Sequence, residues 1–396
     1  MPGHTADSPT CEPSMKLEQV INLHDLRTMA QQRLPRMAFD FIEGSADDEL
    51  GLRNNREAFE RWRMLPRFLV DVSQRDVSVE LFGRRYSTPV GISPMGLAGM
   101  FRPGADAMMA EAAVRHNVPY IMSGASNESL ETAARIAPDH AWFQLYRTLE
   151  ESINEHLVGR ARDAGINSLV LTADVVVNSN RERNRRNGFL RPFRLTPSIA
   201  WQALMHPRWT VDYLRSGGHP MMQNWRPYAP AGASADDVAE LFGKLTPAAN
   251  STWHSLEKLR RMWPRKLLVK GLLHPDDARQ AVALGADGLI VSNHGARQLD
   301  RSVSSLEMLP EIHAAVPDTP LILDSGVRRG SDIVLARCLG ARFALCGRPM
   351  MYAVAAAGTE GVGRAVSILN NEVDKVIAQL GCPRFEDLNM DYLRRA

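Results

Sequence analysis

A histidine in the second half of the chain has the residue type and the neighbours of a general base. His294 lies in the run SNHGARQLD, directly after a short apolar segment, and an imidazole titrates near neutral pH. The run TAD, which ends at Asp174, follows another apolar segment. A buried carboxylate can orient an imidazole and stabilise its protonated form. The two residues therefore predict proton abstraction, with His294 as the base and Asp174 behind it.

Two arginines lie close to these residues in the sequence. Arg297 follows His294 by three positions, and Arg181 follows Asp174 by seven. The planar guanidinium group matches the two oxygens of a carboxylate. We therefore expect Arg181 and Arg297 to bind the carboxylate of a small acid.

Two glycine-rich runs near the C-terminus are typical of a phosphate site. DSGVRRG covers residues 324–330 and CGRP covers residues 346–349. Glycines let backbone N–H groups approach an anion, and Arg328 and Arg348 add charged donors. These loops predict a phosphate-bearing ligand.

Lys270 ends the apolar run LLVK. A buried lysine is costly unless an anion accompanies it, which favours a bound anion or a salt bridge. Schiff-base chemistry is a third interpretation. The phosphate loops, His294 and the two arginines favour the anion.

Eight short apolar runs alternate with segments of helical periodicity, which indicates βαβ units and a parallel sheet. Eight such repeats predict an α/β fold of the TIM-barrel type, whose active site lies at the C-terminal ends of the strands. All eight runs end in residues that could take part in binding or catalysis. The fourth connection is unusually long and predicts an insert at about 190–250. The runs cover residues 89–93, 119–123, 142–146, 168–172, 267–271, 288–292, 321–325 and 343–347.

Composition limits the class of protein. The chain has 396 residues, of which 44% are hydrophobic and 23% charged, with a net charge of +2. These values exclude a disordered or fibrous protein and a dedicated nucleic-acid binder. Four cysteines without C-x-x-C spacing favour a reducing, cytoplasmic setting, and nothing predicts a metal site. We expect a disordered tail over 1–16 and one domain over 17–393, with a helical segment broken at Pro35 before a barrel at about 89–378.

The motifs together resemble the FMN-dependent α-hydroxy-acid oxidase and dehydrogenase family. SNHGARQLD, DSGVRRGSD, GRPMMYAVAAAGTEGV, FQLY, LTADVVVNSNRER and LLVKG carry the likeness, which extends over about 20–393. RLPRM, ASNES, HPRW and the final GCP most resemble the membrane-associated members that act on mandelate. The resemblance implies oxidation of an L-2-hydroxy acid, mandelate-like or with another large or aromatic side chain, to the 2-oxo acid.

The resemblance also gives each residue a role. His294 would be the base with Asp174 behind it, Arg181 and Arg297 would bind the substrate carboxylate, and Tyr146 would contact the α-hydroxyl. Asp324 would hold the ribityl chain of FMN, and its phosphate would lie on Gly326, Arg328, Gly347 and Arg348. The flavin ring would contact Pro94, Met95, Gly96, Ser123, Gln144, Thr172, Lys270 and Ser292.

Three positions depart from the family pattern. Phe41 replaces a tyrosine whose hydroxyl normally reaches the substrate carboxylate, and Met95 replaces a threonine near the flavin. Ser179 and Asn180 change the context of Arg181. These departures leave open an FMN-binding homologue with weak or altered activity, which acts as a partner protein. A barrel without flavin that binds a phosphorylated sugar is a further alternative.

The acceptor and the location are inferred from Gly96 and from the insert. Gly96 takes a position that is often alanine in family oxidases, which favours a quinone or another respiratory-chain acceptor over oxygen. An oxygen-using oxidase and an L-lactate dehydrogenase remain alternatives. The insert mixes aromatic residues with arginines over 192–225, which is typical of a peripheral membrane surface on the inner face of the membrane. A subunit interface or a folded lid also fits this composition, and the family resemblance implies a homotetramer.

Overall fold

The computed structural model describes residues 15–188 and 196–396. The predicted tail, apart from residues 15 and 16, lies outside the described residues. The first element is the short helix η1 (Leu17–Gln19).

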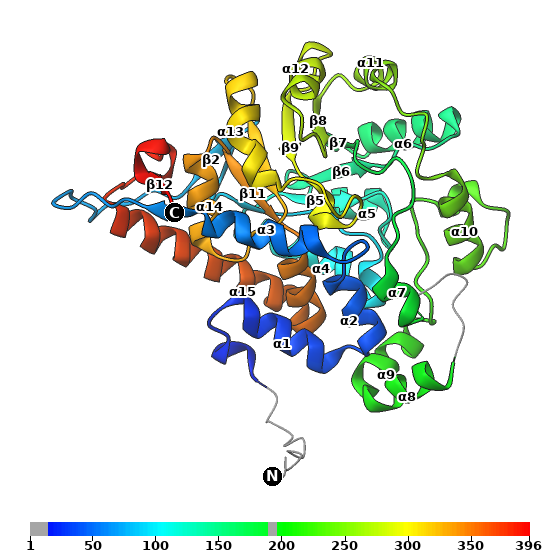
Figure 1. The fold of residues 1–396 in the computed structure, drawn as a ribbon. Coiled ribbons are helices and arrows are strands. Elements are labelled where there is room, and N and C mark those ends of the chain that lie inside the picture. The colour runs from blue at the N-terminus through cyan, green and yellow to red at the C-terminus, as the bar shows by residue number, and fades with distance from the viewer. Residues whose placement is uncertain (1–14, 189–195) are drawn as a thin grey trace, which may run out of the picture.

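Eight parallel strands close into a barrel, as the sequence predicts. Their order around the barrel is β10-β11-β4-β5-β6-β7-β8-β9 (Figure 1). Most strand residues are buried, as expected where a parallel sheet is covered on both faces. The strands are β4 (Val90–Ile92), β5 (Tyr120–Ser123), β6 (Ala141–Leu145), β7 (Ser168–Thr172), β8 (Lys266–Lys270), β9 (Gly288–Val291), β10 (Leu321–Asp324) and β11 (Phe343–Cys346).

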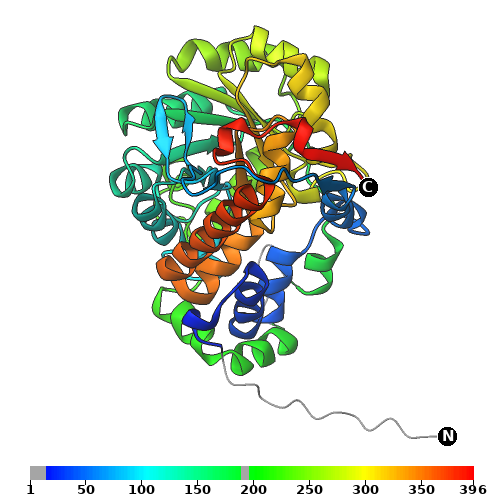
Figure 2. The same ribbon diagram turned by 90° about the vertical axis from the view of Figure 1, so that its left-hand side faces the viewer.

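Helices cover the outside of the barrel. Helix α15 continues over 33 residues with a kink at Ala357 and Gly358, and it also contacts the N-terminal helix α1. Figure 2 shows α15 crossing the molecule with the N-terminal helices beside it. The covering helices are α4 (Ala105–His116), α5 (Leu130–Ile136), α6 (Glu151–Asp163), α11 (Trp253–Met262), α12 (Pro275–Ala283), α13 (Ser305–Ala315), α14 (Gly330–Cys338) and α15 (Arg348–Leu380).

The N-terminal segment is helical and breaks at Pro35. Helix α1 (Leu23–Arg33) begins with a capping box, in which Asn22 Oδ1 accepts from the backbone N–H of Asp25. Helices α2 (Arg36–Glu43) and α3 (Leu50–Glu60) follow. The sequence did not predict three short strands before the barrel: β1 (Trp62–Met64), which pairs with the C-terminal β12 (Leu393–Arg395), and the hairpin β2 (Val79–Leu81) and β3 (Arg84–Tyr86).

The long connection between β7 and β8 forms a folded insert. Its helices before α11 are α7 (Glu182–Arg186), α8 (Pro197–Met205), α9 (Pro207–Arg215), η3 (Arg226–Tyr228) and α10 (Ala235–Leu245). Helices α8 and α9 lie at the edge of the molecule near α1 and α2 in both views (Figures 1 and 2). Two buried tryptophans hold the insert to the barrel loops. Trp209 Nε1 donates to Met100 O at 2.9 Å, and Trp225 Nε1 donates to Gly124 O at 3.0 Å.

Candidate active site

A cavity of about 670 Å³ opens at the C-terminal ends of the barrel strands. This volume lies in the range of small-molecule and cofactor sites. Among the residues predicted from the sequence, Asp174, Ser123, Gln144, Thr172 and Ser292 do not line the cavity. The predicted residues that line it are Pro94, Met95, Gly96, Tyr146, Arg181, Lys270, His294, Arg297, Asp324, Gly326, Arg328, Gly347 and Arg348.

The predicted base and its carboxylate partner are in contact. The separation of His294 Nδ1 and Asp174 Oδ1 is 2.9 Å, which leaves Nε2 as the other ring nitrogen. Burial lowers the pKa of His294, and the charge of Lys270 lowers it further against the opposing effect of Asp174. Burial by itself raises the pKa of Asp174, but the charges of His294 and Lys270 outweigh this effect and lower it. A neutral imidazole beside an ionised carboxylate is the state that a general base requires.

Local backbone geometry fixes this pair. His294 adopts a left-handed conformation with φ of 57°, and its N–H donates to Ser292 Oγ at 3.0 Å. Gly271, with φ of +104°, follows β8, and a Cβ there would lie 2.5 Å from Asp174 Cγ. Only glycine therefore leaves room for the carboxylate at this position.

Lys270 belongs to a buried polar cluster at the ends of β8, β9 and β10. Its Nζ lies 3.1 Å from Asp324 Oδ2 and donates to Ser292 Oγ at 2.9 Å. Burial lowers the pKa of Lys270, but Asp324 and Asp174 outweigh it and raise the pKa above its usual value. Lys270 therefore remains an ammonium group at the cavity wall, which disagrees with Schiff-base chemistry.

Besides Asp174 Oδ2, two buried polar atoms near this cluster have no hydrogen-bond partner in the described part of the chain. They are Gln144 Nε2 and Thr172 Oγ1. Gln144 Oε1 is satisfied, since Ser123 Oγ donates to it at 3.1 Å. Thr172 pairs in register with Lys270. Buried groups of this kind are rare without a ligand or water, so the pair indicates a polar ligand at the ends of β6 and β7.

The two predicted carboxylate-binding arginines line the same cavity. Burial lowers the pKa of Arg297 well below its usual value, and the charges of Arg181 and Arg348 lower it further. Burial also lowers the pKa of Arg181. Among the described residues, neither guanidinium forms an ion pair with a carboxylate: Arg297 Nη1 donates to Phe41 O at 2.8 Å, and Arg181 Nε to Ser179 Oγ at 3.2 Å. Two neighbouring buried cations without a counter-ion predict an anionic ligand.

The predicted phosphate loops meet at another part of the cavity wall. Arg348 Nη2 donates to Gly44 O at 2.9 Å and to Gly295 O at 3.0 Å. Burial lowers the pKa of Arg348 to about 10. Asp332 Oδ2 accepts the backbone N–H groups of Arg328 and Arg329, which shapes the loop after β10. The glycines and both arginine side chains fit a phosphate group.

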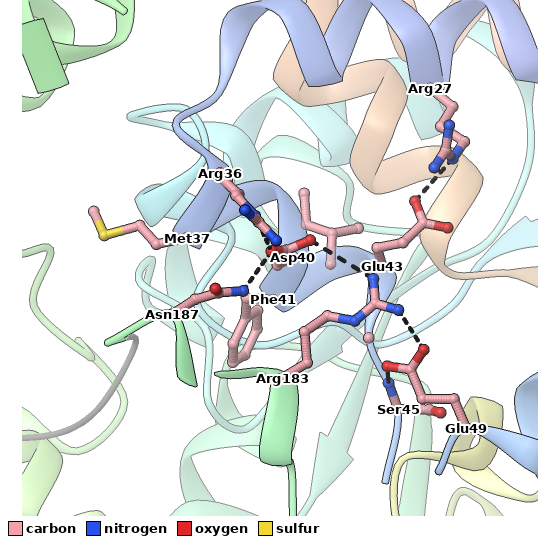
Figure 3. A network of polar contacts seen from close by, with 12 residues as sticks. Arg27, Arg36, Met37, Asp40, Phe41, Glu43, Ser45, Glu49, Arg183 and Asn187 are labelled. Carbon is pink, nitrogen blue, oxygen red and sulfur yellow. Dashed lines mark hydrogen bonds and ion pairs between the residues drawn. The ribbon is translucent and has the colours of Figure 1, made fainter. Parts of the chain in front are cut away.

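A polar network joins α2 to α7, and the sequence did not predict it (Figure 3). Arg183 of α7 forms ion pairs with Asp40 of α2 and with Glu49, and the side-chain amide of Asn187 donates to Asp40. This network holds Phe41 and Arg181 against the same end of the cavity. No sequence signal reveals it, since the partners are more than 130 positions apart.

Phe41 packs against other rings. Its ring lies 5.8 Å from that of Phe101, and the Arg297 guanidinium lies 4.8 Å from its centroid. Compared with the tyrosine of the family pattern, Phe41 lacks the hydroxyl and presents only its ring to Arg297. Met95 lines the cavity, as does Ser179 in the changed context of Arg181.

Two opposite kinds of surface enclose the cavity. We call Lys270, His294, Arg297, Asp324, Arg328 and Arg348 the barrel wall. The insert supplies the other surface, which sequence reasoning missed because amphipathic periodicity does not name the partner of a helix. We call its later part, from residue 222 to 247, the insert wall: Met222, Ala239, Phe242, Gly243, Thr246 and Pro247. The start of the connection lines the cavity with polar residues instead, among them Asn178, Arg181 and Arg185.

Comparison with known proteins identifies the family of the chain. The family model described as FMN-dependent dehydrogenase matches residues 30–395. The (S)-mandelate dehydrogenase of Pseudomonas putida is 41% identical over 377 residues, covering 95% of this chain and 94% of the relative. An L-lactate oxidase of Nostoc sp. is 36% identical over 378 residues, covering 94% of this chain and 98% of the relative.

A solved structure shares the fold. The crystal structure of the monotopic membrane protein (S)-mandelate dehydrogenase superposes with a TM-score of 0.92 at 41% identity, covering 95% of this chain and 100% of that chain.

Proposed function

The chain belongs to the FMN-dependent dehydrogenase family, and from this premise we propose that it oxidises a mandelate-like L-2-hydroxy acid and passes the electrons to a membrane quinone. FMN-dependent oxidation of 2-hydroxy acids, the FMN cofactor and the likeness to mandelate dehydrogenase are confirmed expectations. The family assignment shows that the sugar-phosphate barrel without flavin is wrong. The observation that carries the proposal is the contact of His294 with Asp174 beside a cavity that His294 lines together with Arg181 and Arg297, neither of which forms an ion pair among the described residues.

The residues present fit FMN. The unpartnered Gln144 Nε2 and Thr172 Oγ1 suit the polar edge of a flavin ring. Lys270 suits the part of the ring that gains negative charge on reduction, and the loops bearing Arg328 and Arg348 suit the phosphate. Pro94, Met95, Gly96, Ser123 and Ser292 would complete the ring site, with Asp324, Gly326 and Gly347 toward the ribityl phosphate. When bound, FMN supplies the two-electron acceptor of the reaction.

The chain's own residues hold the substrate and move one proton. Arg181 and Arg297 bind the carboxylate, and the Tyr146 hydroxyl contacts the α-hydroxyl. His294 Nε2 accepts a proton from the substrate, and Asp174, at 2.9 Å from Nδ1, stabilises the imidazolium that forms. Burial of the site excludes water and strengthens each of these interactions.

The insert wall supports a large substrate side chain. It is apolar for most of its extent and adds to Leu97, Phe101 and Ala125 on the barrel loops. A methyl group would leave most of this surface uncovered, whereas an aryl group would bury it at about 25 cal/mol per Å².

Anaerobic flavin bleaching tests the activity and the substrate together. The purified holoenzyme is mixed with lactate, glycolate, mandelate and longer 2-hydroxy acids, and loss of the oxidised-flavin absorbance is followed. We expect the S enantiomer of mandelate to bleach the flavin faster than lactate. If no acid bleaches the flavin, the result would support the alternative based on Phe41 and Met95, an FMN-binding homologue with weak or altered activity. Faster bleaching by lactate would contradict the proposed preference for mandelate.

Helices α8 and α9 support contact with an anionic bilayer. Their most exposed apolar side chains are Trp201, Leu204, Met205 and Leu214, each at least 59% exposed, with Arg208 and Arg215 beside them. Such a surface suits the headgroup region. No helix among the described residues is both long and apolar enough to cross a membrane. Trp209, Met222 and Trp225 are buried, so these members of the predicted membrane segment pack inward, and Phe193 lies outside the described residues.

Liposome sedimentation tests this surface. The double variant Trp201→Ser/Leu204→Ser should lose binding to vesicles of phosphatidylglycerol and phosphatidylethanolamine. Phe68→Ser/Leu69→Ser removes two apolar side chains that are even more exposed, from a loop away from α8 and α9, and serves as the control. Equal sedimentation of both variants would contradict the membrane surface.

The electron acceptor and the oligomeric state are each tested by a separate measurement. Gly96 has no room for a methyl group, because a Cβ there would lie 2.9 Å from that of Ala125. We expect reoxidation of the reduced enzyme to be faster with a soluble quinone than with oxygen; the reverse would indicate an oxidase. A homotetramer, predicted from the family resemblance, is measured by light scattering.

A further inference from the structure

Helix α10 turns one face toward the cavity. Ala239, Phe242, Gly243 and Thr246 line it, at positions i, i+3, i+4 and i+7, which share one side of a helix. A side chain at position 243 would therefore extend along the cavity side of α10.

Gly243 leaves free space on this face. A Cβ at Gly243 meets no atom within 4 Å, and its φ is not positive. Neither the neighbours nor the backbone require glycine here, and glycine weakens a helix relative to other residues. Gly159 of α6 is also free of neighbours, but it does not line the cavity. Gly243 is exposed to solvent and lines the cavity, so the free space beside it lies at the open edge of the ligand cavity.

The wall around this space is held in place. The ring of Phe242 lies 4.9 Å from that of Trp225, and Trp225 is anchored by its hydrogen bond to Gly124 O at 3.0 Å. Asn127 Nδ2 donates to Pro220 O at 3.1 Å at the start of the same segment. These contacts fix the cavity wall beside Gly243 against the barrel loops.

Aromatic contacts lead from the base to this space. The ring of Tyr146 lies 6.5 Å from that of His294 and 6.2 Å from that of Phe242. Phe242 is the neighbour of Gly243 in the chain. A substrate whose α-carbon lies at His294 would direct its side chain past Tyr146 and Phe242.

We propose that Gly243 sets the length of the substrate side chain, and that the enzyme accepts L-2-hydroxy acids whose aryl group is carried on a longer chain, such as 2-hydroxy-4-phenylbutyrate. This inference rests on the proposed function and deepens it, because it names the substrate class of the same site.

The test compares Gly243→Leu with Gly159→Leu, a matched substitution in a helix away from the cavity. The ratio of kcat/KM for 2-hydroxy-4-phenylbutyrate to that for lactate is measured in both holoenzymes. In Gly243→Leu we expect the ratio to fall at least about tenfold, mainly through KM, because the added side chain takes the space of several methylene groups. Gly159→Leu should keep the wild-type ratio. An unchanged ratio in a folded Gly243→Leu enzyme would overturn the proposal.

A binding measurement separates this proposal from the proposed function. Calorimetry with 4-phenylbutyrate, which has no α-hydroxyl, reports the side-chain space without turnover. We expect binding to weaken at least about tenfold in Gly243→Leu and less in Gly243→Ala, which also serves if the leucine variant does not fold. Equal affinity in wild type and variant overturns the role of Gly243. Binding that follows this order without flavin bleaching by any acid would contradict only the proposed oxidation.

Discussion

The barrel wall and the insert wall enclose one cavity with opposite chemistry. The barrel wall concentrates buried charges, such as Lys270 with Asp324 at 3.1 Å and His294 with Asp174 at 2.9 Å. The insert wall presents mostly apolar or small residues. The barrel wall is therefore suited to the reaction at the α-carbon, which all hydroxy-acid substrates share, and the insert wall to the side chain, in which they differ. Changes to the two walls should have separable effects.

The largest effect is expected from the base. His294→Ala should reduce the rate of flavin reduction by at least about 100-fold, because a positioned general base contributes 10²- to 10⁴-fold. Stopped-flow absorbance measures this rate. The flavin should stay bound, since His294 is not among the residues proposed to hold it. An active, flavin-replete variant would contradict the role of His294.

A smaller effect, with a change in pH dependence, is expected from Asp174→Asn. Asp174 raises the pKa of His294 against the effect of burial, so its neutralisation should lower that pKa further. Because the base must be neutral, the acid limb of the kcat/KM profile should move to lower pH. The plateau should fall by up to about tenfold for each pKa unit lost, because the rate of general-base catalysis follows the basicity of the base only in part.

The pH profile of the wild-type enzyme is the control for Asp174→Asn. Its acid limb should lie below the ordinary histidine value, since the pKa of His294 is lowered. A shift of the limb to higher pH in the variant would contradict the proposed pairing.

An opposite effect of at least about tenfold is expected from Phe41→Tyr. The Arg297 guanidinium lies 4.8 Å from the Phe41 ring, so a hydroxyl here would lie near the carboxylate site. A hydrogen bond to a charged group contributes about 1.5 to 3 kcal/mol, and KM should fall for lactate and mandelate alike. Steady-state kinetics with both acids checks this. A lower KM for only one acid would mean that the ring at position 41 contacts the substrate side chain rather than its carboxylate.

The smallest effect on the reaction is expected from Trp225→Phe behind the insert wall. It leaves the buried Gly124 carbonyl without its donor and should lower the free energy of unfolding by about 1 to 3 kcal/mol, as urea denaturation measures. The preference for mandelate over lactate should fall by less than about tenfold, since the wall remains apolar. A loss of lactate turnover equal to that of mandelate would mean that the two walls are not separable.

The sequence by itself determined the barrel and brought forward the candidate reacting groups. Residues 168–172, for example, are predicted as a strand and form β7 (Ser168–Thr172). Buried parallel strands are continuous apolar runs, and their C-terminal ends must converge once the barrel closes. His294 and Asp174, 120 positions apart, could therefore be paired in advance. The known geometry of a closed barrel was enough to place these two residues near each other in space.

Only the tertiary structure decided which residues of the insert face inward. Trp201 and Trp209 occur in the same aromatic and basic segment, yet Trp201 is 63% exposed and Trp209 is 4% exposed. The network of Arg183 with Asp40 and the free space at Gly243 were equally hidden. Periodicity shows that a helix has an apolar face, but it does not identify the surface against which that face packs. That choice depends on contacts between segments distant in the chain, and here it formed the side-chain half of the cavity.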